Sequence, residues 1–211
     1  MRTLVFTGNV DKRILVLPLL RGLSSLGETL LVTDDPNYLR GTDKNQIMGS
    51  IKVKLITHYD SNFVLKYDDG VDYINVVWDV REFIPEKYDK LVVCRHKDRT
   101  LCTDKILDKT DEIDKNGDIV TESTEVVITH FVDKKELKKT HYTDRGEHTD
   151  ILGKAELLEL KLADYKWLSM CEETAEIFAL KNAAVSGLLA KLTCESVGMP
   201  AKDWEAIINK A

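Results

Sequence analysis

Gly8 and Lys12 follow an apolar run at residues 3–7, and their types and spacing suit a loop that binds phosphate. Glycines let backbone N–H groups curl around an anion at φ values that other residues resist. A lysine at the end of such a loop neutralises phosphate oxygens, and the N-terminus of the next helix adds partial positive charge. The loop that begins at Gly8 is therefore the first candidate for a functional site.

Three other residues of this loop depart from what a site for a nucleotide and its Mg²⁺ needs. Asp11 places a carboxylate where a triphosphate would have to lie, and that repulsion is strong at low local dielectric. Asn9 stands where glycine serves best, although Asn tolerates positive φ better than most residues. Arg13 has no oxygen that could ligate Mg²⁺. Asp11 can instead cap a helix, because its carboxylate can accept hydrogen bonds from the first backbone N–H groups.

Carboxylates that could hold Mg²⁺ follow two later strand-like runs. Asp34 and Asp35 end the second run of the chain, and Asp79 ends a run near the middle. Asp89 competes with Asp79, because it introduces another apolar run that suits a buried strand. The residues alone do not choose between Asp79 and Asp89, and turn formation or helix capping is a competing role for Asp34 and Asp35. No spacing of histidines or cysteines predicts a metal site.

The segment T-G-N-V-D-K-R-I, from Thr7 to Ile14, resembles the phosphate loop of the ParA/MinD group of P-loop ATPases, whose pattern is K-G-G-x-G-K-[ST]-[ST]. The later segment L-L-V-T-D-D-P, which ends at Pro36, also resembles that family, so the resemblance covers residues 1–40. It implies an ATP–Mg²⁺ site with an acidic pair near the attacking water and one further carboxylate on Mg²⁺. Thr7 stands where the family has a lysine that reaches the nucleotide of a partner subunit.

Because two of the loop glycines, the hydroxyl residues and that lysine are absent together, the resemblance implies a member that has lost hydrolysis. We expect a vestigial phosphate loop of Gly8, Asn9, Asp11, Lys12 and Arg13, with no catalytic residue, no metal and no cofactor. The expected function is a non-catalytic dimerisation, localisation or assembly factor in a larger protein machine, with protein partners and a homodimer. The alternative is an active ATPase switch that positions DNA or a protein complex, with ATP–Mg²⁺ on Lys12. A small-molecule enzyme has no nucleophile–base pair or metal set to support it.

The elements around these residues alternate between strand and helix. Residues 3–7 and 29–33 predict strands, and residues 11–26 predict a helix that contains Pro18. A strand, a loop, a helix and a strand at this spacing form a βαβ unit, which requires parallel strands and a right-handed crossover. We expect an α/β fold over residues 1–211 as a single domain. It is a mostly parallel central sheet flanked by helices in a P-loop NTPase-like three-layer sandwich, with hairpin insertions and a helical C-terminal part.

The rest of the chain predicts further strands and then helices. Strand-like runs at residues 51–57, 62–67 and 73–80 suggest an antiparallel meander added to the sheet, and residues 114–118 predict a hairpin turn. Further strands are expected at residues 88–94 and 125–129, and helices at residues 151–164, 167–192 and 201–210.

Composition describes an ordinary water-soluble protein. The chain has 211 residues, 43% of them hydrophobic, and a formal net charge of −6, which gives no strong nucleic-acid signal. No apolar run approaches the roughly 20 residues of a membrane helix, so no transmembrane segment is expected. The four cysteines form no C-x-x-C pair and are expected as free thiols. These features predict a cytoplasmic protein, most simply a bacterial or phage one.

Overall fold

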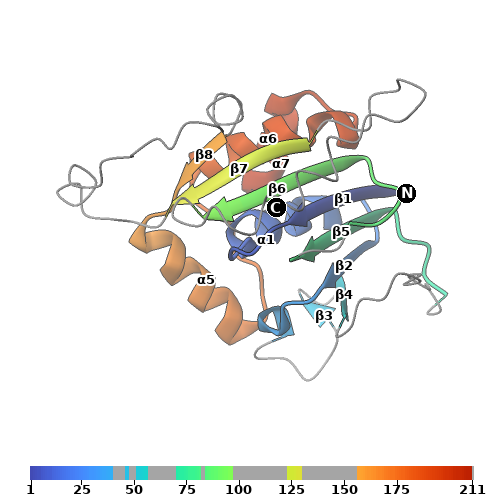
Figure 1. Cartoon of the computed structure of the whole chain (residues 1–211), viewed down its shortest axis with the longest axis horizontal. Coiled ribbons are helices and arrows are strands. Elements are labelled where there is room, and N and C mark those ends of the chain that lie inside the picture. The colour runs from blue at the N-terminus through green and yellow to red at the C-terminus, as the bar shows by residue number, and fades with distance from the viewer. Residues whose placement is uncertain are drawn as a thin grey trace, which may run out of the picture.

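The described strands of this chain form one eight-stranded sheet. The computed structural model describes residues 1–39, 46–47, 51–56, 70–81, 84–96, 123–129 and 156–210. The strands lie in the order β3-β4-β2-β5-β1-β6-β7-β8 (Figure 1). Every neighbouring pair is parallel except β3 with β4. The strands are β1 (Arg2–Thr7), β2 (Thr29–Thr33), β3 (Gln46–Ile47), β4 (Ile51–Leu55), β5 (Asn75–Val80), β6 (Lys90–His96), β7 (Ser123–Thr129) and β8 (Glu156–Glu159).

The parallel sheet confirms the α/β class predicted from the sequence, and β1 lies in its middle, between β5 and β6. The predicted antiparallel meander is wrong, because β4 and β5 both pair with β2 in parallel. The strand β5 is buried along its whole length, as strands of parallel sheets are. The predicted strand at 62–67 and the hairpin turn at 114–118 lie outside the described residues.

The helices α1, α6 and α7 pack together on one face of the sheet (Figure 1). Their apolar side chains share a core with Leu4, Phe6, Leu31, Val77 and Val92 of the strands. The opposite face of the sheet contributes a second buried cluster, which contains Val5, Val76 and Trp78. The described helices are α1 (Arg13–Ser24), the 3₁₀ helix η1 (Pro36–Leu39), α5 (Leu162–Thr174), α6 (Ala183–Val197) and α7 (Ala201–Lys210).

The first βαβ unit forms as predicted, since the strands at 3–7 and 29–33 appear as β1 and β2. The helix between them begins at Arg13 and contains Pro18, so the proline neither delays nor ends it. The helix predicted at 201–210 is α7. Within the described part of the chain, no helix is both long and apolar enough to cross a membrane.

Two C-terminal predictions are wrong. Residues 156–159, expected inside a helix, form β8, which pairs in parallel with β7. A short leucine-rich run fits a buried strand as well as a helix, and the neighbouring strand decides the outcome here. The single helix predicted over 167–192 is two helices. Its first part, α5, ends at Ala175 with φ of 55°, and α6 begins after Asn182, whose side chain accepts hydrogen bonds from two backbone N–H groups of its first turn.

Candidate functional site

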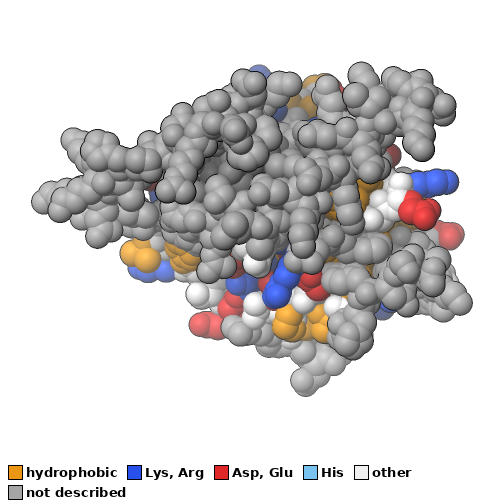
Figure 2. Space-filling view, viewed as in Figure 1, with side chains coloured by type: hydrophobic (Ala, Val, Ile, Leu, Met, Phe, Trp, Pro, Cys, Tyr) orange, Lys and Arg blue, Asp and Glu red, His pale blue; other side chains and the backbone are white. Residues whose placement is uncertain are grey.

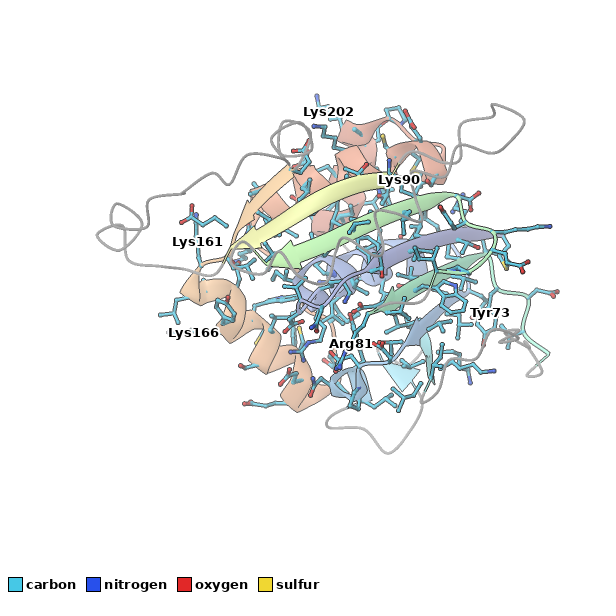
Figure 3. All side chains as sticks on the ribbon, in the orientation of Figure 1. Tyr73, Arg81, Lys90, Lys161, Lys166 and Lys202 are labelled. Atoms are coloured by element: carbon cyan, nitrogen blue, oxygen red, sulfur yellow. The ribbon has the colours of Figure 1, made fainter. Side chains whose placement is uncertain are left out.

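The carboxyl ends of β1, β2 and β5 surround one polar cavity of about 230 Å³. Parallel strands end at the same edge of a sheet, so residues that follow different strands meet there. Arg81, which follows β5, is labelled at this edge in Figure 3, whereas Tyr73, which precedes β5, is labelled at the opposite edge. The cavity is lined by Asn9, Val10, Asp11, Lys12, Arg13, Asp34, Asp35, Asn37, Asp79 and Arg81.

The structure brings the predicted site residues together at this cavity. Every one of them except Gly8 lines it, and Gly8 adjoins it at the end of β1. Asp89 is the exception among the alternatives, because its carboxylate accepts a hydrogen bond of 2.6 Å from the backbone N–H of Thr3, near the start of β1. Asp79, in contrast, lies near the end of β5 and contacts Lys12. The geometry therefore places Asp79, and not Asp89, beside the loop.

Gly8 is required at its position by both backbone conformation and space. Its φ is +115°, and a Cβ atom added there would lie 1.9 Å from the carbonyl oxygen of Cys94. Its N–H donates a 3.0 Å hydrogen bond to the carbonyl of Arg81, and the hydroxyl of the buried Thr7 donates to the same carbonyl. The loop thus begins with its backbone held tightly between β5 and β6.

Lys12 lies folded back into its own loop. Its Nζ donates to the carbonyl oxygens of Gly8 at 2.7 Å and Val10 at 3.2 Å, and it lies 2.9 Å from Oδ1 of Asp79. A lysine ammonium has three protons to donate, and these three acceptors use all of them. An anion that approached Lys12 would have to displace one of these partners.

Asp79 is the buried counter-ion of Lys12. Its second oxygen, Oδ2, accepts a hydrogen bond from the hydroxyl of Tyr38 in η1. Burial lowers the pKa of Lys12, but the negative groups around it, with the Asp79 carboxylate first among them, together outweigh this and hold that pKa above its usual value. Burial raises the pKa of Asp79, opposed by the charge of Lys12 and by the Tyr38 hydrogen bond. Lys12 therefore stays protonated at neutral pH, with Asp79 as its fixed partner.

Cys94 lies next to this pair in β6 and is inert as a nucleophile. The side chain is fully buried, and burial raises the pKa of its thiol to about 12. A thiol with that pKa is neutral at pH 7, and only the thiolate is strongly nucleophilic. The structure thus offers no cysteine chemistry at the cavity through Cys94.

Arg13 has its guanidinium surrounded by carboxylates. Nε and Nη2 donate to the two oxygens of Asp11 at 2.9 and 2.7 Å, Nη1 donates to Glu172 of α5, and Asp35 lies 3.8 Å from Nε. The Asp11 carboxylate also accepts the backbone N–H of Arg13, the first residue of α1, at 3.1 Å. Lys12, and not Asp11, is the N-cap residue of α1, so the expected capping role of Asp11 is wrong. Burial raises the pKa of Asp11, but its contacts with Arg13 lower it below the usual value. Asp11 therefore remains charged and paired.

Asp34 and Asp35 each accept a hydrogen bond from a backbone N–H group. Asp34 accepts the N–H of Arg81 at 3.0 Å, and Asp35 accepts the N–H of Asn37 at 2.9 Å. The Asp35 contact confirms the capping role, since Asn37 lies in the first turn of η1. Among the residues that the structure describes, no group of three or more His, Cys, Asp and Glu side chains is arranged to hold a metal ion.

Tyr38, Asn37, Arg81 and Glu172 belong to the site but were not predicted. Arg81 lies two residues after Asp79, so its place at the end of the same strand could have been predicted from the sequence. Glu172 lies on a helix far along the chain, and no local pattern points to its contact with the loop. On the face drawn in Figure 2, charged side chains of both signs lie together near η1 and the strand ends, rather than in a patch of one sign.

No protein-family model matches this chain, and a search of curated proteins finds no similar sequence.

Proposed function

We propose that this chain is a pseudo-ATPase of ParA/MinD-like fold that works without turnover, as a dimerisation, localisation or assembly factor in a larger protein machine. The observation that carries the proposal is that the two cations of the loop, Lys12 and Arg13, are both occupied by groups of the chain itself. A nucleotide would have to compete with those groups for every charge contact it makes.

The charge of the cavity supports the absence of nucleotide. Its lining contains the carboxylates of Asp11, Asp34, Asp35 and Asp79 but only the three cationic side chains Lys12, Arg13 and Arg81. An ATP triphosphate brings several negative charges, and a site with an excess of negative charge repels it. The cavity volume of about 230 Å³ is also below the roughly 300–1,000 Å³ of typical small-molecule sites.

The remaining features of an active family member are absent from the described site as well. Thr7, which stands at the position of the intersubunit lysine, is a buried residue bonded to the backbone of Arg81. Arg13 stands at the position of a Mg²⁺-binding hydroxyl and is tied to Asp11 and Glu172. These departures support a role for the protein through surfaces that bind protein partners, including a second copy of the chain.

Isothermal titration calorimetry with ATP–Mg²⁺ tests this proposal. We expect no binding heat at millimolar nucleotide, and the same sedimentation coefficient with and without ATP–Mg²⁺. The double substitution Asn9→Gly/Asp11→Gly is the matched control, because it returns glycines to the loop and removes one negative charge. Micromolar binding by the natural sequence that is lost in Lys12→Ala would contradict the proposal.

An active nucleotide-dependent switch remains the second candidate, and one observation favours it. The loop lysine and a buried carboxylate on the neighbouring strand, Lys12 and Asp79, lie side by side, and these are the charges that a nucleotide and its Mg²⁺ need. That candidate requires ATP hydrolysis that falls at least about tenfold, the effect of losing one charge-assisted contact, in both Lys12→Ala and Asp79→Asn. The non-catalytic proposal expects no measurable hydrolysis in any of the three proteins.

A further inference from the structure

One side chain, Arg13, joins three segments that are far apart in the sequence. Its guanidinium contacts Asp11 in the loop, Asp35 after β2 and Glu172 in the last turn of α5. The side chains of Arg13 and Glu172 are 11% and 23% exposed, so their contact is partly shielded from water. The cation therefore connects the start of α1 to the C-terminal end of α5.

The other end of α5 has an anchor of its own. Asp164 accepts a 3.0 Å hydrogen bond from the side chain of Asn182, the residue that caps α6, and a 2.7 Å bond from the backbone N–H of Lys161. In Figure 1, α5 runs along the edge where the strands end and lies apart from α6 and α7. The helix is thus attached at its start through Asp164 and at its end through Glu172.

Apolar side chains also pack at the C-terminal end of α5, since Cys171 and Ile177 are buried in the main core. A small cavity of about 20 Å³ lies between α1, η1 and α5, lined in part by Leu17, Tyr38, Cys171 and Ile177. The helix then ends at Ala175, whose φ of 55° is unfavourable for a residue with a Cβ atom. The Arg13–Glu172 contact adds a charge-assisted bond to the apolar packing at this end of α5.

We propose that Arg13 is a built-in latch that fixes the C-terminal end of α5 against the phosphate-loop segment without any ligand. The inference rests on the proposed function, in which no nucleotide is present to order this edge of the sheet. Arg13 supplies that order from within the chain, because it satisfies the loop carboxylate and the α5 carboxylate at once. The protein then presents α5 in one fixed position at all times, as a constitutive assembly factor requires.

Hydrogen-exchange mass spectrometry on the full chain, without nucleotide, tests the latch. Arg13→Gln and Glu172→Gln should each speed amide exchange in the last two turns of α5 about tenfold, because each removes a charge-assisted contact that opposes local opening. The double variant should exchange no faster than the faster single variant. Exchange in α7 should not change. Lys191→Gln, which breaks the exposed ion pair with Glu156, is the matched control and should leave α5 unchanged.

Unchanged α5 exchange in Arg13→Gln would overturn the latch, and so would an equal increase across α6 and α7, which would mean global destabilisation. Arg13→Lys keeps the positive charge but loses the forked geometry, and it should give an intermediate increase confined to α5. It serves as the test if Arg13→Gln does not fold. ATP–Mg²⁺ binding by calorimetry would contradict the proposed function but leave the latch standing, since the latch is measured without nucleotide.

Discussion

Lys12 and Asp79 form an ion pair with an Nζ–Oδ1 distance of 2.9 Å, and their side chains are 4% and 3% exposed. Lys12 comes from the loop after β1 and Asp79 from β5, so the pair connects two neighbouring strands of the parallel sheet. Buried charges are tolerated only when they are paired and hydrogen-bonded, and here two loop carbonyls and the Tyr38 hydroxyl complete the set.

Removing one member of this pair should destabilise the protein strongly. Lys12→Met leaves the Asp79 carboxylate buried without its counter-ion, and we expect a loss of about 3–5 kcal/mol in the free energy of unfolding. The double variant Lys12→Met/Asp79→Asn should lose less than the sum of the single variants, because neither charge remains. Urea unfolding of Lys12→Met, Asp79→Asn and the double variant measures this coupling. Lys191→Met, whose ion pair is exposed, is the control and should cost about 0–1 kcal/mol.

Glycine at position 8 should be indispensable. In Gly8→Ala the new Cβ would lie 1.9 Å from the Cys94 carbonyl oxygen at a φ of +115°, so we expect a loss above about 3 kcal/mol or failure to fold. Gly198→Ala is the matched control, because Gly198 also has positive φ but has no atom within 4 Å of an added Cβ. It should cost only about 1 kcal/mol. Equal unfolding midpoints for the two variants would show that β1 and β6 do not approach as closely as described.

Ala175 should be a site of easy stabilisation. It is the one non-glycine residue of the described chain with positive φ, 55°, and it ends α5. Glycine adopts this conformation without the Cβ penalty and is the usual residue at such helix ends. Ala175→Gly should therefore raise the free energy of unfolding by about 0.5–1 kcal/mol, measured by thermal or urea unfolding. A lower stability would mean that Ala175 makes an apolar contact worth more than the backbone strain.

The Asp11 carboxylate should contribute to stability only above acidic pH. Burial raises its pKa, but the contacts with Arg13 bring the pKa in the folded protein below the usual value of an aspartate. A group with a depressed folded-state pKa stabilises the fold above its unfolded pKa, and that contribution is lost as pH falls through the folded-state value. In urea unfolding between about pH 2 and pH 6, the free energy of unfolding should fall more steeply with decreasing pH for the natural protein than for Asp11→Asn. If the free energy of unfolding fell equally with pH in both proteins, the Asp11–Arg13 contact would not be formed in solution.

The sequence predicted those parts of the fold that depend on nearby residues. Gly8, Lys12 and the apolar runs on either side form one local pattern, so the loop, β1, α1 and β2 could be recognised together. The choice between Asp79 and Asp89 could not be made, because both adjoin apolar strands and only the pairing of β5 with β1 places Asp79 at the loop.

Other parts could not be predicted because they depend on distant partners. The strand β8 forms from a leucine-rich run that also suits a helix, and its pairing with β7 decides between the two. Glu172 meets Arg13 across 159 positions of the chain, a contact with no local signature. Asn182 is different, since Asn before an apolar run is a typical helix cap, and it could have revealed the break between α5 and α6.

A crystal structure from crystals grown in millimolar ATP–Mg²⁺ tests the central claim most directly. That claim concerns which groups contact the two cationic side chains of the loop, Lys12 and Arg13. We predict that Lys12 will remain on the carbonyls of Gly8 and Val10 and on Asp79, that Arg13 will remain on Asp11 and Glu172, and that the cavity will contain no nucleotide. A triphosphate with its magnesium ion bound over residues 8–14, with Lys12 turned from Asp79 to the phosphates, would contradict the account.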